Sequence, residues 1–148
     1  MKRLPHVAML LVAVVLIAAD KGEKKKSDLK KIQGKWTVVE SYRKGKKSDD
    51  AMGTVFTFSG KNAISVPKGG GKITVAVFEL RPEKTPQELD LRIEKITWKC
   101  IYSLSGDTLE ICYAPLDNMR PDAIGTAAGD ERELIVLKRV KGDAKKKP

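Results

Sequence analysis

The chain has 148 residues and a formal net charge of +10, so it is a small and basic protein. Its lysines gather at the two ends, with six in 20–31 and four in 141–148. Surfaces that bind nucleic acid usually carry Lys and Arg on a folded face, together with aromatic residues for stacking. That pattern is absent, and we expect no specific nucleic-acid partner.

The first nineteen residues have the pattern of an export signal. Lys2 and Arg3 precede an uncharged apolar run over 7–19, which is shorter than the roughly 20 apolar residues that span a bilayer. Ala18 and Ala19 are small residues of the kind found near a cleavage point. We predict a signal peptide over 1–19 and a secreted or periplasmic protein of the cell envelope, which meets the membrane only through this segment. A retained N-terminal anchor is the alternative.

The rest of the chain divides into one domain and two tails. Residues 20–31 and 141–148 are too polar to bury a core, and both tails are expected to be disordered. Only 27–32 favours a helical turn, with Ser27 or Asp28 as its cap. Residues 32–140 have the length of one small domain.

Short turn clusters punctuate this domain, and between them lie segments rich in Val, Ile, Thr and aromatic residues. Regular spacing of this kind is typical of an all-β sandwich or barrel. Because short turns join successive strands, we expect an antiparallel meander that closes on itself into a barrel of about eight strands. The predicted strands are 34–43, 53–59, 62–67, 72–80, 88–95, 97–104, 108–114 and 132–140.

The segment 72–80 is apolar on both of its faces. A strand of this kind is either covered on both sides or paired with another subunit. The oligomeric state is left open by the sequence.

The hairpin around Gly106 fixes the relation between the two cysteines. Aligning the apolar faces pairs Leu104 with Leu109 and Tyr102 with Ile111. Cys100 and Cys112 then fall on opposite faces of the sheet, which favours two buried free thiols. Export favours a disulfide instead, and that alternative needs a bulge in the hairpin.

Two stretches of the domain resemble sequence patterns of a known protein family. The first is Gln33-Gly34-Lys35-Trp36, and the second runs from Tyr102 through Gly106-Asp107-Thr108-Leu109 to Arg120-Pro121, with Leu137-Lys138-Arg139 at the end. Together, over residues 29–140, they resemble a family of small secreted lipocalin-like domains of unknown function that is expanded in planctomycete bacteria. The resemblance implies an exported lipocalin-like barrel and brings no established activity.

In lipocalin-like barrels the indole of the Gly-x-Trp pattern closes one end, and an arginine of the last strand lies across it. Those residues are Trp36 and Arg139 here, and both are expected to be structural. One departure is Ile124, which stands where the family leads us to expect an aromatic residue. Arg120, in the long 115–130 loop, either recognises an anion or ties the loop down, and loop anchoring is the favoured interpretation.

The residue inventory argues against catalysis. His6 is the only histidine and lies inside the predicted signal, so the mature chain lacks the general base of Ser-His and Cys-His nucleophiles. No metal-ligand spacing, phosphate loop or dinucleotide fingerprint is present. We therefore predict a protein that is not an enzyme, with no cofactor, no metal and no catalytic residue.

Strand alternation nominates a candidate cavity lining. Glu40 shares the predicted inward face of Trp36, so it either lines a wet cavity or lies on the surface where the strand leaves the barrel. For each aromatic candidate, packing in a filled barrel is the alternative. The candidates are Glu40, Tyr42, Phe56, Phe58, Trp98, Tyr102 and Tyr113.

Two functions are compatible with these features. The leading hypothesis is a lipocalin-like module that binds a small apolar or amphipathic ligand in the barrel. The alternative is a non-catalytic structural or interaction protein of the cell envelope, with its barrel filled by side chains.

Overall fold

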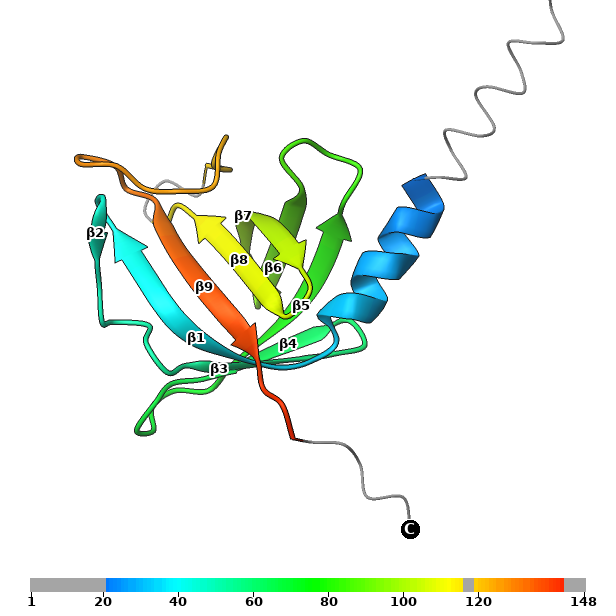
Figure 1. Ribbon diagram of the computed structural model, residues 1–148, viewed down its shortest axis with the longest axis horizontal. Helices are drawn as coiled ribbons and strands as arrows, with labels where there is room; N and C mark the ends of the chain where they lie inside the picture. The colour runs from blue at the N-terminus through cyan, green and yellow to red at the C-terminus, as the bar shows by residue number, and fades with distance from the viewer. Residues whose placement is uncertain (1–20, 116–118, 143–148) are drawn as a thin grey trace, which may run out of the picture.

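The computed structural model describes residues 21–115 and 119–142. The predicted signal over 1–19 and residues 143–148 of the predicted C-terminal tail lie outside these residues. The described part is built from antiparallel strands and one helical segment (Figure 1).

All eight predicted strands are present, and a two-residue strand, β2, is added. The strands are β1 (Gly34–Arg43), β2 (Lys46–Lys47), β3 (Val55–Ser59), β4 (Asn62–Val66), β5 (Thr74–Arg81), β6 (Glu88–Ile93), β7 (Ile96–Ser105), β8 (Thr108–Tyr113) and β9 (Glu133–Arg139). The sequence did not predict β2, which only extends the end of β1 through a short turn.

The sheet closes because β1 pairs with β3 on one side and with β9 on the other. Around the barrel the strand order is β1-β3-β4-β5-β6-β7-β8-β9, and β2 stands outside the ring. Every neighbouring pair is antiparallel, so this is the lipocalin-like meander barrel that the sequence predicts.

A β-bulge in β1 interrupts its pairing with β9. The register with β9 shifts between Val38 and Glu40, so Val38 lies opposite Leu137 while Ser41 lies opposite Ile135. A bulge adds one residue to its strand and reverses which side chains face the core beyond it. After Trp36 and Val38, the inward positions of β1 therefore continue with Ser41.

The N-terminal tail differs from the prediction that it is disordered. The helical turn predicted over 27–32 is present, but the helix is longer and covers residues 21–32. The part of this tail that the structure describes is therefore not disordered, and Ser27 and Asp28 lie inside the helix instead of capping it. Ile32 and Leu29 pack against the barrel core, at one end of the barrel (Figure 1). Within the described residues, no helix has the length and apolar character needed to cross a membrane.

A buried carboxylate also holds the helix. Tyr102 donates a hydrogen bond of 2.7 Å from its hydroxyl to Asp28, and Gln87 donates a second of 3.2 Å to the same oxygen. Burial and the bond to Asp28 raise the pKa of Tyr102 well above its ordinary value. The tyrosine therefore stays a hydrogen-bond donor over the physiological pH range.

Trp36 closes the end of the barrel beside this helix, as predicted. Its side chain is fully buried and donates a hydrogen bond of 2.8 Å to the Ile32 carbonyl. The guanidinium carbon of Arg139 lies 4.2 Å from the indole centroid, a cation–π contact. Gly34 has a φ of +112°, and a Cβ there would lie 3.3 Å from Arg139, so the Gly-x-Trp pattern requires its glycine at this crossing.

The β7–β8 hairpin has the predicted register. Tyr102 lies opposite Ile111 and Leu104 opposite Leu109, so the two cysteines point to opposite faces. Cys100 and Cys112 are both free and buried, which settles the thiol question in favour of two unpaired cysteines.

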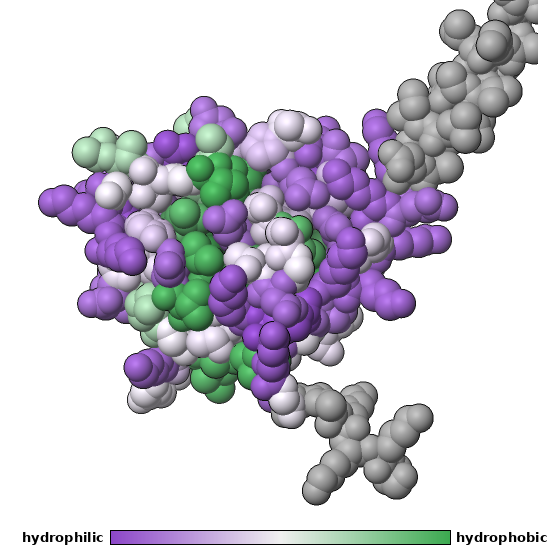
Figure 2. Space-filling view, in the orientation of Figure 1, coloured by the Kyte–Doolittle hydropathy of each residue, from purple (hydrophilic) through white to green (hydrophobic). Residues whose placement is uncertain are grey.

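Hydrophobic residues also remain on the outside of the barrel. Figure 2 shows a narrow hydrophobic band on the mainly hydrophilic face where β1 and β9 lie. On β5, Val75 and Val77 are exposed on the outer face, while Ala76 and Phe78 are buried. The expected cover or partner for the second face of the 72–80 strand is thus not supplied by the described residues of this chain.

We expect Trp36→Ala to lower the free energy of unfolding by about 3–5 kcal/mol, because it empties a fully buried indole site. Trp98→Ala is the matched control, since Trp98 is only partly buried. Chemical denaturation measures both variants, and equal losses would show that Trp36 does not hold the end of the barrel.

Stability should fall in alkaline solution because of Cys100. Burial raises the pKa of its thiol from 9.0 to about 12, so the unfolded chain loses this proton near pH 9 while the folded chain keeps it. The contribution is fully present below pH 9 and is lost between pH 9 and 12, at about 1.4 kcal/mol per pH unit. In urea titrations from pH 7 upward, Cys100→Val should have a shallower slope by that amount. Parallel slopes for the two proteins would contradict the prediction.

Candidate ligand-binding cavity

The barrel interior holds an open cavity of about 610 Å³. It lies away from Trp36, at the end of the barrel where the turn between β6 and β7 and the segment leading into β5 form the rim. Its lining is mostly apolar. The lining residues are Phe56, Ala63, Ser65, Lys72, Ile73, Thr74, Val75, Ala76, Leu91, Ile93, Glu94, Ile96, Trp98, Ile111, Tyr113 and Ile135.

Small side chains on β4 and β5 leave this space open. Ala63 lies opposite Ala76, and Ser65 lies opposite Thr74, so two adjacent strands present a wall of small residues to the interior. In small barrels large inward side chains usually fill the centre. The alternation of these four residues is therefore the local sequence feature that replaces core with cavity.

Larger residues fill the rest of the interior and form the cavity floor. Phe58 and Phe78 pack edge to face with their ring centroids 5.1 Å apart, and both are buried. Leu89 and Leu109 are fully buried in the same core cluster. The barrel thus has a packed half next to the helix and an open half at the mouth.

Aromatic rings stand on opposite walls of the open half. Trp98 on β7 and Tyr113 on β8 stack with their centroids 5.3 Å apart. Phe56 lies on β3, four places away from β7 in the ring of eight strands, and so on the opposite side. A bound molecule would lie between these surfaces, which favour flat or extended apolar groups.

Polar groups in the cavity are few. The hydroxyls of Ser65 and Thr74 make no hydrogen bond to any residue that the structure describes, so they are available to a ligand. The charged lining residues, Lys72 and Glu94, are both exposed and lie at the rim. The interior therefore offers hydrogen bonding without a charge.

Tyr113 is held at the mouth by a hydrogen bond to an ion-paired carboxylate. It donates a hydrogen bond of 2.7 Å to Glu133, which also pairs with Arg43. Burial and the bond to Glu133 raise the pKa of Tyr113 well above its ordinary value, and the Glu133 carboxylate raises the pKa of Arg43. The Tyr113 ring is thereby fixed in position beside Trp98, with its hydroxyl neutral.

Three of the seven predicted lining residues line the cavity: Phe56, Trp98 and Tyr113. Phe58 was wrongly included because it belongs to the buried floor. Tyr102 was also wrong, since it is buried beside Asp28 at the closed end.

Glu40 and Tyr42 do not line the cavity, contrary to the prediction. Both fall beyond the bulge in β1, where they lie opposite Val136 and Leu134 on the outer face. Tyr42 donates a hydrogen bond of 2.6 Å to Glu40, whose side chain is exposed. The surface interpretation of Glu40 is confirmed, and Tyr42 packs against an outer hydrophobic cluster.

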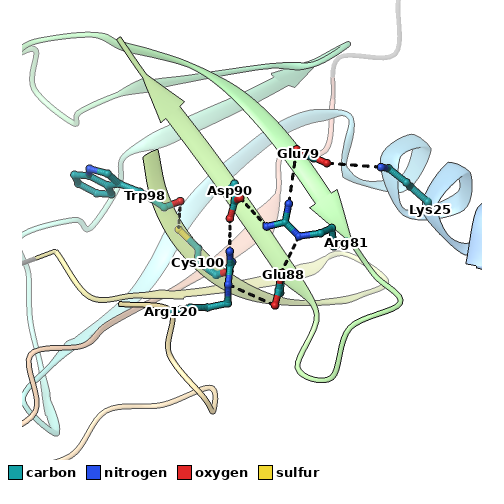
Figure 3. Close-up of polar contacts among 8 residues, drawn as sticks. All are labelled: Lys25, Glu79, Arg81, Glu88, Asp90, Trp98, Cys100 and Arg120. Atoms are coloured by element: carbon teal, nitrogen blue, oxygen red, sulfur yellow. Dashed lines mark hydrogen bonds and ion pairs between the residues drawn. The ribbon is translucent and has the colours of Figure 1, made fainter. Parts of the chain in front are cut away.

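Arg120 anchors the long loop to the outside of the barrel. It donates a hydrogen bond of 2.6 Å to the Cys100 carbonyl and one of 2.7 Å to Asp90 (Figure 3). Asp90 also accepts a hydrogen bond of 2.6 Å from Arg81. Burial raises the pKa of Asp90, but hydrogen bonds from the two arginines lower it further than burial raises it, so the carboxylate stays charged. The guanidinium of Arg120 is thus engaged by the barrel, as the anchoring interpretation expects.

The anchored loop covers a small outer cluster of Ile101, Cys112 and Leu134. Ile124 packs on this cluster, and the Cys112 thiol donates a hydrogen bond of 3.5 Å to the Gly125 carbonyl. The departure at Ile124 therefore changes the outer cover of the barrel, away from the cavity.

The chain matches no protein-family model, no curated protein and no solved structure. Within the described residues, no three His, Cys, Asp or Glu side chains come together as a metal site. The cavity itself is the strongest basis for assigning a function.

Several lining residues were missed by the sequence analysis, above all Ala63, Ser65, Thr74 and Ala76. Their signal was present as alternation on two short strands. The predicted lining consisted of aromatic side chains and one carboxylate, whereas a cavity depends on the small residues that leave space.

Arg120→Ala should lower the free energy of unfolding by about 1–2 kcal/mol, because it removes charge-assisted hydrogen bonds that are partly screened by solvent. It should also speed proteolysis within the 115–132 loop. Arg92→Ala, on the exposed side of β6, is the control. Unchanged cleavage of the loop in Arg120→Ala would show that other contacts hold it.

Proposed function

We propose that this chain is an exported, non-catalytic binding protein that takes a small, uncharged and largely apolar ligand into its barrel. The open cavity of about 610 Å³ carries the proposal, because that volume falls in the range of small-molecule sites. The alternative, a structural or interaction protein with its barrel filled by side chains, would have no such space.

The lining supports an uncharged ligand. A charged group placed among Leu91, Ile111 and Ile135 would lose its hydration without gaining an opposite charge. A single carbonyl or hydroxyl group is compatible, since Ser65 and Thr74 offer it hydrogen bonds. The aromatic walls add contact area for a flat or conjugated body.

Export is proposed on the sequence of residues 1–19 and is compatible with the free thiols. Cys100 and Cys112 point to opposite faces of the sheet, so they cannot pair with each other without a change of register. Burial raises the pKa of both thiols, which slows oxidation in an oxidising compartment.

Filling the cavity tests the binding proposal. We expect wild-type protein to bind the uncharged fluorophore N-phenylnaphthylamine, and Ala76→Leu to weaken that binding at least about tenfold, the equivalent of about 1.4 kcal/mol. Val77→Leu places the same side chain on the exposed outer face of the same strand and should bind as the wild type does. Fluorescence titration measures all three proteins, and circular dichroism checks their folding.

Equal affinities in Ala76→Leu and Val77→Leu would place the fluorophore outside the cavity and would overturn the proposal. Native mass spectrometry of protein purified from its host then identifies the natural ligand by its mass. A charged ligand in that experiment would contradict the proposed ligand class. It would not contradict the cavity as the binding site.

A further inference from the structure

The cavity mouth carries apolar side chains that point into water. Ile73 and Val75 are each 57% exposed and Ile96 is 59% exposed. All three border the cavity, and Val75 does so from the outer face of β5 next to the opening. Exposed apolar residues are ordinary when they are scattered singly, but a group around an opening marks an interaction site.

Two lysines accompany these residues. Lys72 directly precedes Ile73, and Lys95 directly precedes Ile96, and both lysines are exposed. We define Lys72, Ile73, Val75, Lys95 and Ile96 as the mouth rim. Glu94 lies at the same opening, so the two lysines of the mouth rim face one carboxylate among these residues and the local charge is positive.

We propose that the mouth rim docks on an anionic lipid bilayer, with Ile73, Val75 and Ile96 inserted and the two lysines on the headgroups. Apolar side chains next to lysines are the composition that binds the boundary between headgroups and acyl chains. A bilayer also fits the position of the rim, because the cavity would then open towards the phase in which apolar molecules dissolve. Membrane docking does not depend on the proposed function. Only the role of docking in loading a ligand rests on the proposed function.

The competing orientation uses the opposite end of the protein. The helical residues 21–32 carry six lysines and pack beside Trp36, at the closed end. If that helix were the membrane contact, the mouth would face away from the bilayer. The two arrangements therefore predict opposite faces at the lipid.

Site-directed labelling distinguishes them in the full chain. Cys100 and Cys112 are buried, so a thiol-reactive, environment-sensitive fluorophore would mark an introduced surface cysteine selectively. One protein carries Ile96→Cys in the mouth rim, and the matched control carries Lys24→Cys on the helix. Each is mixed with phosphatidylglycerol vesicles that contain acyl-chain spin labels as quenchers.

We expect several-fold stronger quenching at position 96 than at position 24, and much less quenching at 96 on phosphatidylcholine vesicles. Adding Ile73→Ser and Val75→Ser to Ile96→Cys should abolish most of the quenching, and these exposed positions should leave folding intact. Stronger quenching at position 24 would overturn the proposal in favour of the helix.

Two further outcomes also count against it. A fluorescence change at position 96 that rises with protein concentration, without vesicles, would assign the mouth rim to self-association. Quenching that is unchanged by the serine substitutions would assign membrane binding to another surface. Since N-phenylnaphthylamine binding is measured without vesicles, a failure of docking is distinguishable from a failure of the cavity.

Discussion

The structure depends on the closure of β1 against β9. An open sheet of these strands would expose two long edges, and the pairing of β1 with both β3 and β9 removes them. Closure also brings Arg139 over Trp36 and places its guanidinium within reach of the Gln33 carbonyl, at 2.8 Å. One arginine of the last strand thus ties together the sheet, the indole that fills the end of the barrel, and the chain leaving the helix. The two strands stay paired on both sides of the bulge between Val38 and Glu40.

Side-chain size then divides the closed barrel into a packed half and an open half. Trp36, Phe58 and Phe78 fill the half beside the helix, whereas Ala63 and Ala76 leave space in the other. The polar groups follow the same division. The buried Asp28–Tyr102 bond fastens the helix at the closed end, and Glu133 positions the Tyr113 ring near the mouth. The first half supplies the packed core, and the second half supplies the space on which the proposed binding function rests.

Strand alternation predicted most of the fold, because period-two patterns and turn residues are local. The register around Gly106 could be deduced from apolar faces alone, and the cysteine geometry followed from it. Glu40 and Tyr42 could not be placed correctly, since a bulge adds one residue without changing the composition of its strand. The helix was predicted only as a turn over 27–32, for a different reason: its many lysines hide the spacing of Asp28, Leu29 and Ile32, whose contacts are with distant strands. Tertiary contacts of this kind have no local signature.

The two ends of the barrel differ in what the proposed ligand would meet on its way in or out. Movement through the closed end would require the helix to detach, the Trp36 indole to leave its fully buried site, and the hydrogen bond from Trp36 to Ile32 to break. At the mouth no such barrier stands in the described residues, because Ile73, Val75 and Ile96 surround the opening and are already exposed. Exchange through the mouth needs no unfolding of the sheet. An apolar molecule that leaves the cavity there meets apolar side chains before it meets water, and this favours transfer to a surface in contact with the rim over release into solution.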